Sequence, residues 1–267
     1  MAEIELKLEI SPADIKTIVA SGRFGKPSAS VAQHSIYFDT DERRLFGAGF
    51  TLRIRRTGEA RTQTVKAVGA GASIFARSEW ETPVTADVPV LDQTNPLLGK
   101  LGEIVDDVTP QFEVEIERRI WRLRENASDI ECAVDHGFVT SGERQAPLCE
   151  IELELKDGTP ADIFILARKI EAAAPIKFAV QSKAERGYRL LEEMRPVFKA
   201  EPIDLERGAD AAKGFQTLAQ SCFRQFRLNE TILLRKGSAD ALHQTRVGLR
   251  RLRSAFSLFK PILDDEA

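Results

Sequence analysis

Cysteine and histidine are scarce in this chain of 267 residues, which holds three of each. The cysteines, Cys132, Cys149 and Cys222, are far apart and odd in number, so they indicate no disulfide framework and are interpreted as reduced packing residues. The histidines show neither HxxxH nor HxH spacing, which argues against a zinc site. Any metal ion is therefore expected to be a hard cation bound by carboxylates.

Long apolar runs are missing as well. No segment approaches the roughly 20 apolar residues that a membrane-spanning helix needs. A charged, alternating segment begins at Glu3, which leaves no room for a signal peptide. We therefore expect no membrane partner and a cytoplasmic location.

Charge is spread unevenly along the chain. The net charge is −3, yet residues 207–267 hold 11 Lys and Arg against 6 Asp and Glu. An acidic part followed by a basic part favours two modules, and an anionic partner for the second. Nucleic acid is not the expected partner, because the chain is net acidic and no aromatic residues alternate with the tail arginines in a stacking pattern.

Period-two alternation predicts strands in the first 200 residues. The predicted strands lie near residues 3–9, 33–39, 50–56, 61–68, 75–84, 112–123, 129–135 and 148–156. Helices are predicted from Pro12 to about Ser21, from Pro160 to Ala174 and from Lys183 to Met194. This pattern favours an α+β fold, an eight-stranded antiparallel β tunnel or barrel with flanking helices, followed by a helical segment.

Two shorter segments carry turn or linker signals. The pair His136-Gly137 is interpreted as a hairpin turn. Pro196 and Pro202 indicate a linker, which we place at residues 196–206. Beyond it the pattern is helical, with one apolar stripe formed by Leu242, Leu249, Leu252, Phe256, Phe259 and Leu263.

Several predicted strands carry charge on one face only. In the first strand, Glu3, Glu5 and Lys7 alternate with apolar residues, and Arg53 and Arg55 repeat the arrangement with two cations. Other charged residues at this spacing are Lys66, Arg77, Glu79, Glu81, Glu150, Glu152 and Glu154.

Alternation of this kind usually means a sheet with one face on the core and one in water. Two observations favour another arrangement. Glu150, Glu152 and Glu154 would repel one another without nearby cations, and the signs are sorted, with glutamates on the first and last strands and Arg and Lys between them. If these faces point inward, the carboxylates can bind Mg²⁺ or Mn²⁺ and the cations can bind phosphate oxygens. Phosphoryl transfer needs both.

The charged motifs also follow one another in a recognisable order. Glu3-x-Glu5-x-Lys7 opens the chain. After it come Tyr37-Phe38-Asp39-Thr40, Leu52-Arg53-Ile54-Arg55, Thr64-x-Lys66, Arg77-x-Glu79-x-Glu81, Arg118, Asp135, Glu150-x-Glu152-x-Glu154 and Ser182-Lys183. Over about residues 1–195 this series resembles the signature of the CYTH superfamily, the triphosphate tunnel metalloenzymes.

The resemblance implies metal-dependent hydrolysis of inorganic tripolyphosphate to pyrophosphate and phosphate, with Mg²⁺ or Mn²⁺ as cofactor. Glu5 and Lys7 are implied to be catalytic. The implied substrate-binding residues are Arg53, Arg55, Lys66, Arg77, Arg118 and Lys183. The implied metal ligands are Glu3, Glu5, Glu79, Glu81, Glu150, Glu152 and Glu154, although Glu79 and Glu81 could instead orient neighbouring cations. Of the adjacent pair Arg118 and Arg119, we expect Arg118 to face inward.

The tail carries a second motif. His243, Arg246, Arg250 and Arg253 fall within roughly 80° of one another on a helix, on the flank of the apolar stripe. A basic helix face in solvent, or one paired to acids, would look similar. The motif resembles the HxxRxxxRRxR opening of a CHAD domain, a helical module associated with polyphosphate. Residues 207–267 are therefore expected to be the N-terminal part of a truncated CHAD domain that binds long-chain polyphosphate through these four residues.

Three alternatives remain open. Class IV adenylate cyclases and thiamine triphosphatases are similar in their tunnel, and a module that binds polyphosphate without chemistry is also compatible with the cations. The pairing of CYTH with CHAD resembles inorganic triphosphatases, which favours tripolyphosphate. Clustered carboxylates favour an enzyme, because a pure anion binder gains nothing from them.

Overall fold

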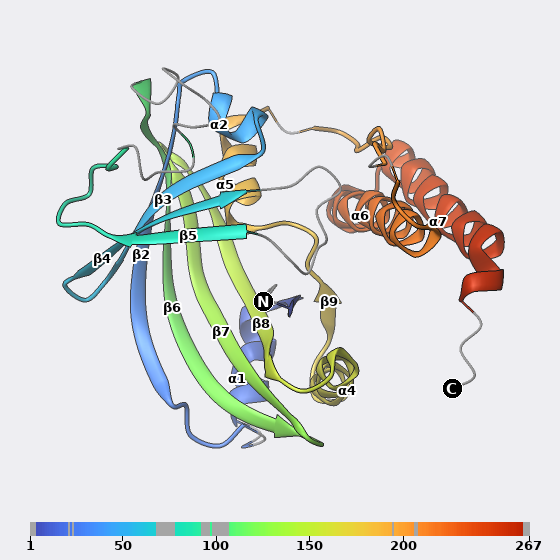
Figure 1. The fold of residues 1–267 in the computed structure, drawn as a ribbon, viewed down its shortest axis with the longest axis horizontal. Coiled ribbons are helices and arrows are strands. Elements are labelled where there is room, and N and C mark those ends of the chain that lie inside the picture. Colours follow the sequence, from blue (N-terminus) through green and yellow to red (C-terminus); the bar gives the residue numbers. More distant parts are fainter. Residues whose placement is uncertain are drawn as a thin grey trace. The chain divides into compact units, whose positions relative to one another are not determined.

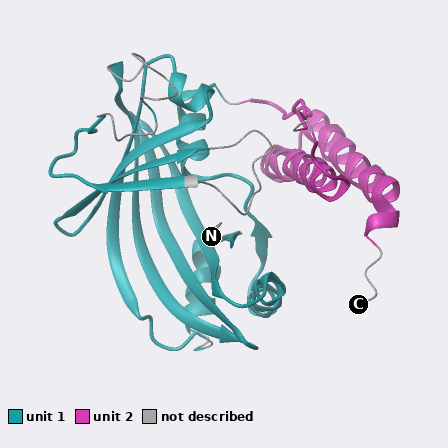
Figure 2. Ribbon diagram, viewed as in Figure 1, with its two compact units in different colours: residues 1–68, 75–193 teal, residues 69–74, 194–267 magenta. Residues whose placement is uncertain are grey.

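The computed structural model falls into two compact units (Figure 2), residues 1–68 with 75–193 and residues 69–74 with 194–267. Among the described residues, none of the helices combines the length and the apolar character that crossing a membrane requires. The structure describes residues 4–20, 22, 24–67, 78–91, 97, 107–193, 195–205 and 208–263.

The first unit is built on one antiparallel sheet of nine strands, in the order β5-β4-β3-β2-β6-β7-β8-β1-β9. Figure 1 shows β3, β4 and β5 running across the long strands β6, β7 and β8. The strands are β1 Ile4–Ile10, β2 Ala29–Asp39, β3 Phe50–Thr57, β4 Ala60–Ala67, β5 Ser78–Pro83, β6 Thr109–Glu125, β7 Ser128–Ser141, β8 Arg144–Asp157 and β9 Ile176–Phe178. The expected α+β architecture is confirmed. The ninth strand, β9, has only three residues, too few for alternation to reveal it.

The interpretation of His136-Gly137 as a hairpin turn is wrong, because both residues lie inside β7. The glycine has a different cause. A Cβ atom on Gly137 would lie 1.9 Å from the backbone oxygen of Glu115 on β6, so the two strands can approach only where the side chain is absent.

Helices begin where the sequence supplies caps. These helices are α1 Pro12–Ala20, α2 Arg44–Gly47, α4 Pro160–Glu171 and α5 Lys183–Leu191. The N-cap Thr159 precedes Pro160, which suits the first turn because proline has no N–H to leave unpaired. At α5, Ser182 accepts a hydrogen bond from the Glu185 backbone and the Glu185 side chain accepts one from the Ser182 backbone. This capping box fixes the point at which Lys183 leaves the helix.

The two faces of the sheet differ in character. We call the face that carries Lys7, Arg53, Arg118 and Glu152 the charged face. The opposite face is apolar, and its side chains pack in two clusters, one with α1 and α4 and one with α2. Because successive strand residues point to opposite sides, apolar burial on one face presents the alternating charges on the other.

One end of the charged face is apolar and is covered by α5. Tyr188 and Ala184 of α5 pack with Phe112 of β6 and Leu148 of β8. The hydroxyl of Tyr188 donates a hydrogen bond of 2.7 Å to Asp39, a carboxylate that also accepts from the backbone N–H groups at the start of α2. These contacts anchor α5 to the sheet.

The second unit is a pair of helices, α6 Ala211–Lys236 and α7 Ala239–Phe259, followed by a short 3-10 turn, Lys260–Ile262. Gly237, at a φ of 64°, ends α6, and Ser238 caps α7. The α7 residues buried against neighbouring parts are small: Ala241, Thr245, Gly248 and Ala255. Much of the predicted apolar stripe is therefore exposed, including Leu242, Leu249 and Phe256.

Candidate active site

A cavity of about 490 Å³ lies against the charged face. Its walls come from seven strands at both ends of the sheet order, so the sheet curls around it. The lining residues are Glu5, Lys7, Arg53, Arg55, Lys66, Glu79, Glu81, Arg118, Glu131, Ala133, Glu152, Glu154 and Lys156. All except Ala133 are charged, and most belong to the predicted site.

Some predicted residues lie elsewhere. Glu3 and Arg77 lie outside the described residues. Glu150 and Lys183 are buried beside the cavity and do not line it. Sequence reasoning also missed Glu131 and Lys156, although both continue the alternation of β7 and β8 and could have been found by extending those strands.

Strand register orders the carboxylates in rows. Glu5 of β1 pairs with Glu154 of β8, which pairs with Glu131 of β7. In the neighbouring row, Lys7 is paired with Glu152. Directly opposed strand residues lie about 5 Å apart at Cβ, so each row brings its side chains within reach of one another.

Glu152 is the most heavily contacted carboxylate of the cavity wall. Its Oε1 lies 2.8 Å from Nζ of Lys7 and 2.8 Å from Nζ of Lys183, and its Oε2 accepts from Arg118. Burial opposes ionisation, but these three cations hold the pKa of Glu152 well below its usual range. Glu152 is therefore a fixed negative charge.

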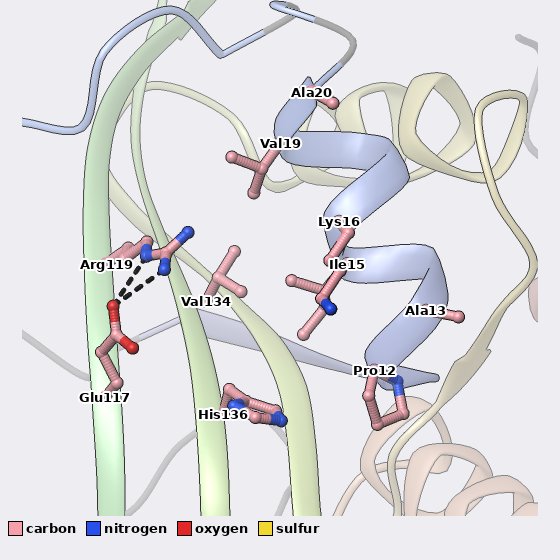
Figure 3. A pocket seen from close by; sticks show the side chains of 10 residues that line it. All are labelled: Pro12, Ala13, Ile15, Lys16, Val19, Ala20, Glu117, Arg119, Val134 and His136. Atoms are coloured by element: carbon pink, nitrogen blue, oxygen red, sulfur yellow. Dashed lines mark hydrogen bonds and ion pairs between the residues drawn. The ribbon is translucent and has the colours of Figure 1, made fainter.

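Arg118 and Arg119 point to opposite faces. Arg118 lines the cavity and donates hydrogen bonds of 2.7 Å from Nε and from Nη2 to the two oxygens of Asp135. Arg119 contacts Glu117 on the far side, at a hollow beside α1 (Figure 3). Burial disfavours the charged guanidinium of Arg118, but Glu152 and Asp135 outweigh it and raise its pKa.

The arginines of β3 are short of partners. Nε of Arg53 and Nε of Arg55 are both buried and have no hydrogen-bond partner among the described residues. Burial and the neighbouring charge of Arg53 lower the pKa of Arg55 to about 10. Buried donors without acceptors are costly, and crowded cations repel one another. An anion in the cavity would relieve both effects.

Lys66 and Glu79 form an ion pair of 2.6 Å beside these arginines, and Arg53 lies 3.6 Å from the same carboxylate. Burial and the charge of Arg53 lower the pKa of Lys66. Glu79 partly neutralises this side of the cavity, and its printed partners are cations, so its present role is to orient them.

The carboxylate side has the donors that a hard divalent ion requires. Glu5, Glu154 and Glu131 offer oxygen atoms only, which suits Mg²⁺ or Mn²⁺. Burial raises the pKa of Glu5, Lys7 opposes this, and Glu152 adds to it. A bound cation would favour the ionised form of Glu5, so the residues present fit a metal site.

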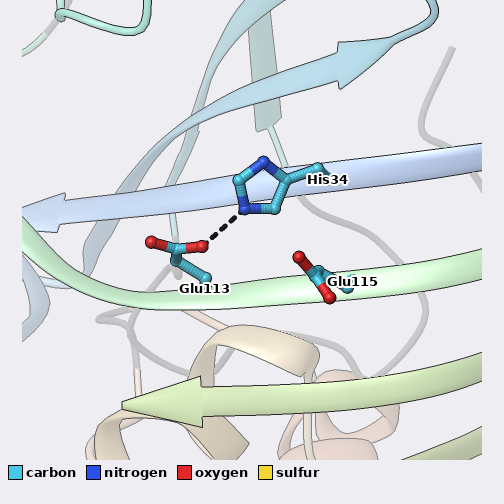
Figure 4. A group of neighbouring side chains, drawn as sticks. All are labelled: His34, Glu113 and Glu115. Carbon is cyan, nitrogen blue, oxygen red and sulfur yellow. Dashed lines mark hydrogen bonds and ion pairs between the residues drawn. The ribbon is translucent and has the colours of Figure 1, made fainter. Parts of the chain in front are cut away.

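The opposite face carries a separate ionic cluster (Figure 4). Nε2 of His34 lies 2.6 Å from Oε2 of Glu113, and Nη2 of Arg56 lies 3.4 Å from Nδ1 of His34. Arginine only donates, so Nδ1 accepts and Nε2–H faces Glu113. Glu115 stands beside them. These contacts link β3, β2 and β6 away from the cavity.

The tail residues His243, Arg246, Arg250 and Arg253 are all exposed on α7. Arg250 and Arg253 line a shallow hollow together with Ser254, Ser257 and Leu258. The described structure therefore brings two of the four predicted residues to one concave surface.

Comparisons with known proteins agree with this geometry. The CHAD domain model matches residues 217–267. An inorganic triphosphatase of Haemophilus influenzae is 31% identical over 199 residues, an alignment that covers 71% of this chain and 55% of that protein. The chain thus spans about half the length of this curated relative.

Solved structures show the same fold. A Hippeastrum protein, described as a candidate adenylyl cyclase with a dominant triphosphatase activity, has a TM-score of 0.50 at 20% identity. The match covers 72% of this chain and 97% of that one. The CYTH domain model matches residues 1–188, most of the first unit, and the chain therefore belongs to the CYTH domain family.

Proposed function

We propose that this chain hydrolyses inorganic tripolyphosphate to pyrophosphate and phosphate with the help of a divalent ion, Mg²⁺ or Mn²⁺. One observation carries the proposal. A single cavity holds a row of carboxylates, Glu5, Glu154 and Glu131, together with two buried arginines whose Nε donors lack partners, Arg53 and Arg55. Phosphoryl transfer requires a metal and cations to neutralise the charge that moves when a P–O bond breaks. The triphosphatase named among the relatives supports this reading.

Each side of the cavity has its own part in the reaction. Arg53, Arg55 and Lys66 would bind the phosphate oxygens and hold the chain in line for attack by water. Glu5 and Glu154, with Glu131, would hold the metal. The metal, when bound, supplies Lewis-acid stabilisation and an oriented water.

Lys7 lies between the two parts. Its Nζ is 3.0 Å from Glu5 and 2.8 Å from Glu152, so it stands beside the proposed metal ligands. From there it would position the reacting phosphate. The roles first assigned to Glu3, Arg77, Glu79 and Glu81 stay predictions.

The wall chemistry favours an inorganic substrate over the alternatives. An adenine or a thiamine ring needs apolar or aromatic surface. Among the described lining residues only Ala133 is uncharged. An adenylate cyclase or a thiamine triphosphatase would need a surface for its ring that these residues do not provide.

The test is phosphate release from tripolyphosphate, ATP and thiamine triphosphate by the purified chain, with and without Mg²⁺ or Mn²⁺. We expect metal-dependent release from tripolyphosphate and little from the other two. Glu5→Gln should lower turnover by about 100-fold or more, because it removes a metal ligand. Glu113→Gln makes the same change on the opposite face and should leave turnover unchanged.

Other results would contradict the proposal. Equal release from ATP would favour a nucleotide enzyme. Absence of turnover with either metal, together with tight polyphosphate binding, would favour a module without chemistry.

The proposal extends to the tail and to the domain division. We assign residues 1–195 to the CYTH domain, 196–206 to a linker and 207–267 to the N-terminal part of a CHAD domain. Long-chain polyphosphate would bind at α7, where Arg250 and Arg253 line a hollow. The double variant Arg250→Ala/Arg253→Ala should weaken that binding. Arg235→Ala/Lys236→Ala, which removes equal charge from exposed positions at the end of α6, should not.

The location is also part of the proposal. Cys132, Cys149 and Cys222 are free thiols in the structure, which suits the reducing cytoplasm.

A further inference from the structure

The ammonium group of Lys183 contacts three carboxylates at once. Its Nζ lies 2.5 Å from Glu150, 2.8 Å from Glu152 and 2.8 Å from Asp135. An ammonium group has three N–H donors, so these partners use all of them. A phosphate oxygen could bind Lys183 only by displacing a carboxylate.

The position of Lys183 separates it from the phosphate-facing cations. Its side chain is 9% exposed and is not part of the cavity wall, which Arg53 and Arg55 do line. Asp135 and Glu150 are more deeply buried still, at 0% and 1%. Buried carboxylates need an adjacent cation, because an unpaired charge inside a protein is strongly destabilising.

The three carboxylates are arranged as ligands of a metal ion would be. One oxygen from each of Asp135, Glu150 and Glu152 lies within 4.8 Å of the others. Oε2 of Glu150 is buried without a hydrogen-bond partner among the described residues, so the ammonium leaves some of the oxygens unused. A divalent ion, which takes six or more oxygen ligands, would use more of them.

The chain delivers this ammonium to a fixed point. Lys183 is the first residue of α5, directly after the capping box of Ser182 and Glu185. The hydrogen bond from Tyr188 to Asp39 holds the other end of the helix. Neither contact leaves the lysine free to follow a substrate.

We infer that Lys183 is a tethered cation that fills a carboxylate cage beside the cavity, excludes divalent ions from the cage and positions Glu152. Lys183 is then a positioning residue and not a phosphate clamp. Glu150 is not a metal ligand, and the metal is left to the row of Glu5, Glu154 and Glu131. The consequence for catalysis rests on the proposed function, whereas the cage itself can be tested without turnover.

The first experiment counts Mn²⁺ bound to the full chain by electron paramagnetic resonance, for the natural protein and for Lys183→Ala. Removing the side chain opens the cage, so the variant should bind one more Mn²⁺ per chain. Its melting temperature should also rise more on addition of Mn²⁺ than that of the natural protein. An unchanged number of bound ions in a folded variant overturns the inference.

A second variant serves if Lys183→Ala does not fold. Glu150→Gln keeps the lysine in place and removes one cage carboxylate. Its affinity for Mn²⁺ should match that of the natural protein, whereas Glu5→Gln should bind Mn²⁺ about tenfold more weakly or worse. A comparable loss in Glu150→Gln would show that Glu150 holds the metal, which contradicts the inference.

Kinetics separate a positioning role from a clamp. Through Glu152, Lys183→Ala should lower kcat, and Lys183→Arg should restore part of it. A rise in KM for tripolyphosphate alone, with the Mn²⁺ number unchanged, would establish the clamp instead. If the natural protein releases no phosphate, the proposed function fails, but the Mn²⁺ counts still decide the cage.

Discussion

Arg118 and Asp135 lie opposite each other on β6 and β7, and the guanidinium group donates two parallel hydrogen bonds of 2.7 Å to the carboxylate. Lysine carries the same charge but cannot make this two-point contact. We expect Arg118→Lys to lower the free energy of unfolding by about 1.5–3 kcal/mol, the typical contribution of a hydrogen bond between charged groups. Urea unfolding measures it.

The neighbouring position supplies the control. Arg119→Lys makes the same change on the opposite face, where Arg119 is more exposed, and should alter stability little. Equal losses in the two variants would show that the fork to Asp135 adds nothing specific.

Arg55 and Arg56 form a similar matched pair on β3. Nε of Arg55 is buried beside the cavity without a partner, while Arg56 lies on the opposite face near His34. Arg55→Ala should raise KM for tripolyphosphate by roughly 10- to 100-fold, because it removes a charged hydrogen bond to the substrate. Arg56→Ala should leave KM unchanged. Steady-state phosphate release checks both, and a normal KM in Arg55→Ala would remove it from the substrate site.

Gly187 sets how closely α5 approaches the sheet. A Cβ atom there would lie 2.0 Å from the ring of Phe112, so Gly187→Ala must push α5 and the ring apart. We expect a loss of about 1–3 kcal/mol in unfolding free energy, measured by thermal or urea unfolding.

Gly214 in α6 provides the comparison, since a Cβ atom there meets nothing within 4 Å. Gly214→Ala should stabilise the chain by about 0.5–1 kcal/mol. A stable Gly187→Ala protein would mean that α5 can shift without cost.

Asp162 should give stability a pH dependence away from the cavity. Hydrogen bonds from Ser128 and Asn126 hold the pKa of its carboxyl below the usual range. A lowered folded-state pKa means that the ionised group stabilises the fold above the unfolded pKa of about 3.9, and that this contribution is lost as pH falls through the folded value. Asp162→Asn should therefore lower the melting temperature by a few degrees at pH 7.

The difference between Asp162→Asn and the natural protein should shrink as the pH falls below about 4. Melting curves recorded from pH 7 down to pH 3 check this. A gap that stays constant over that range would assign the effect to lost geometry and not to ionisation.

Local chemistry made much of the fold predictable. The helix starts at Pro12, Pro160 and Lys183 agree with the structure, because proline or a capping serine marks each of them. The ends of the second and third helices lie a few residues earlier than predicted, at Glu171 and Leu191, since no glycine marks them. Alternation also placed Arg53 and Arg55 on a common face with Lys7, because side-chain direction in a strand follows from parity alone.

The partners of each charge were not predictable in this way. Lys183 looks like any exposed lysine at a helix start, and only the packing of α5 on the sheet brings it to Asp135 and Glu150. The same holds for Glu150, whose alternation with Glu152 and Glu154 suggested three equal ligands. Register and burial divide them, because Glu154 lines the cavity and Glu150 does not.

The apolar end of the charged face, where α5 covers Phe112 and Leu148, gives the cavity a built-in ruler. Along β8 the carboxylates run from Glu150 to Glu154, a distance of about 13 Å at the rise of an extended strand. An anion that enters past Lys156 has only that depth before it meets hydrocarbon, which offers no donor to a phosphate oxygen. A longer phosphate chain would leave its remaining units outside, so the fold itself limits how much of a polymer the site can hold.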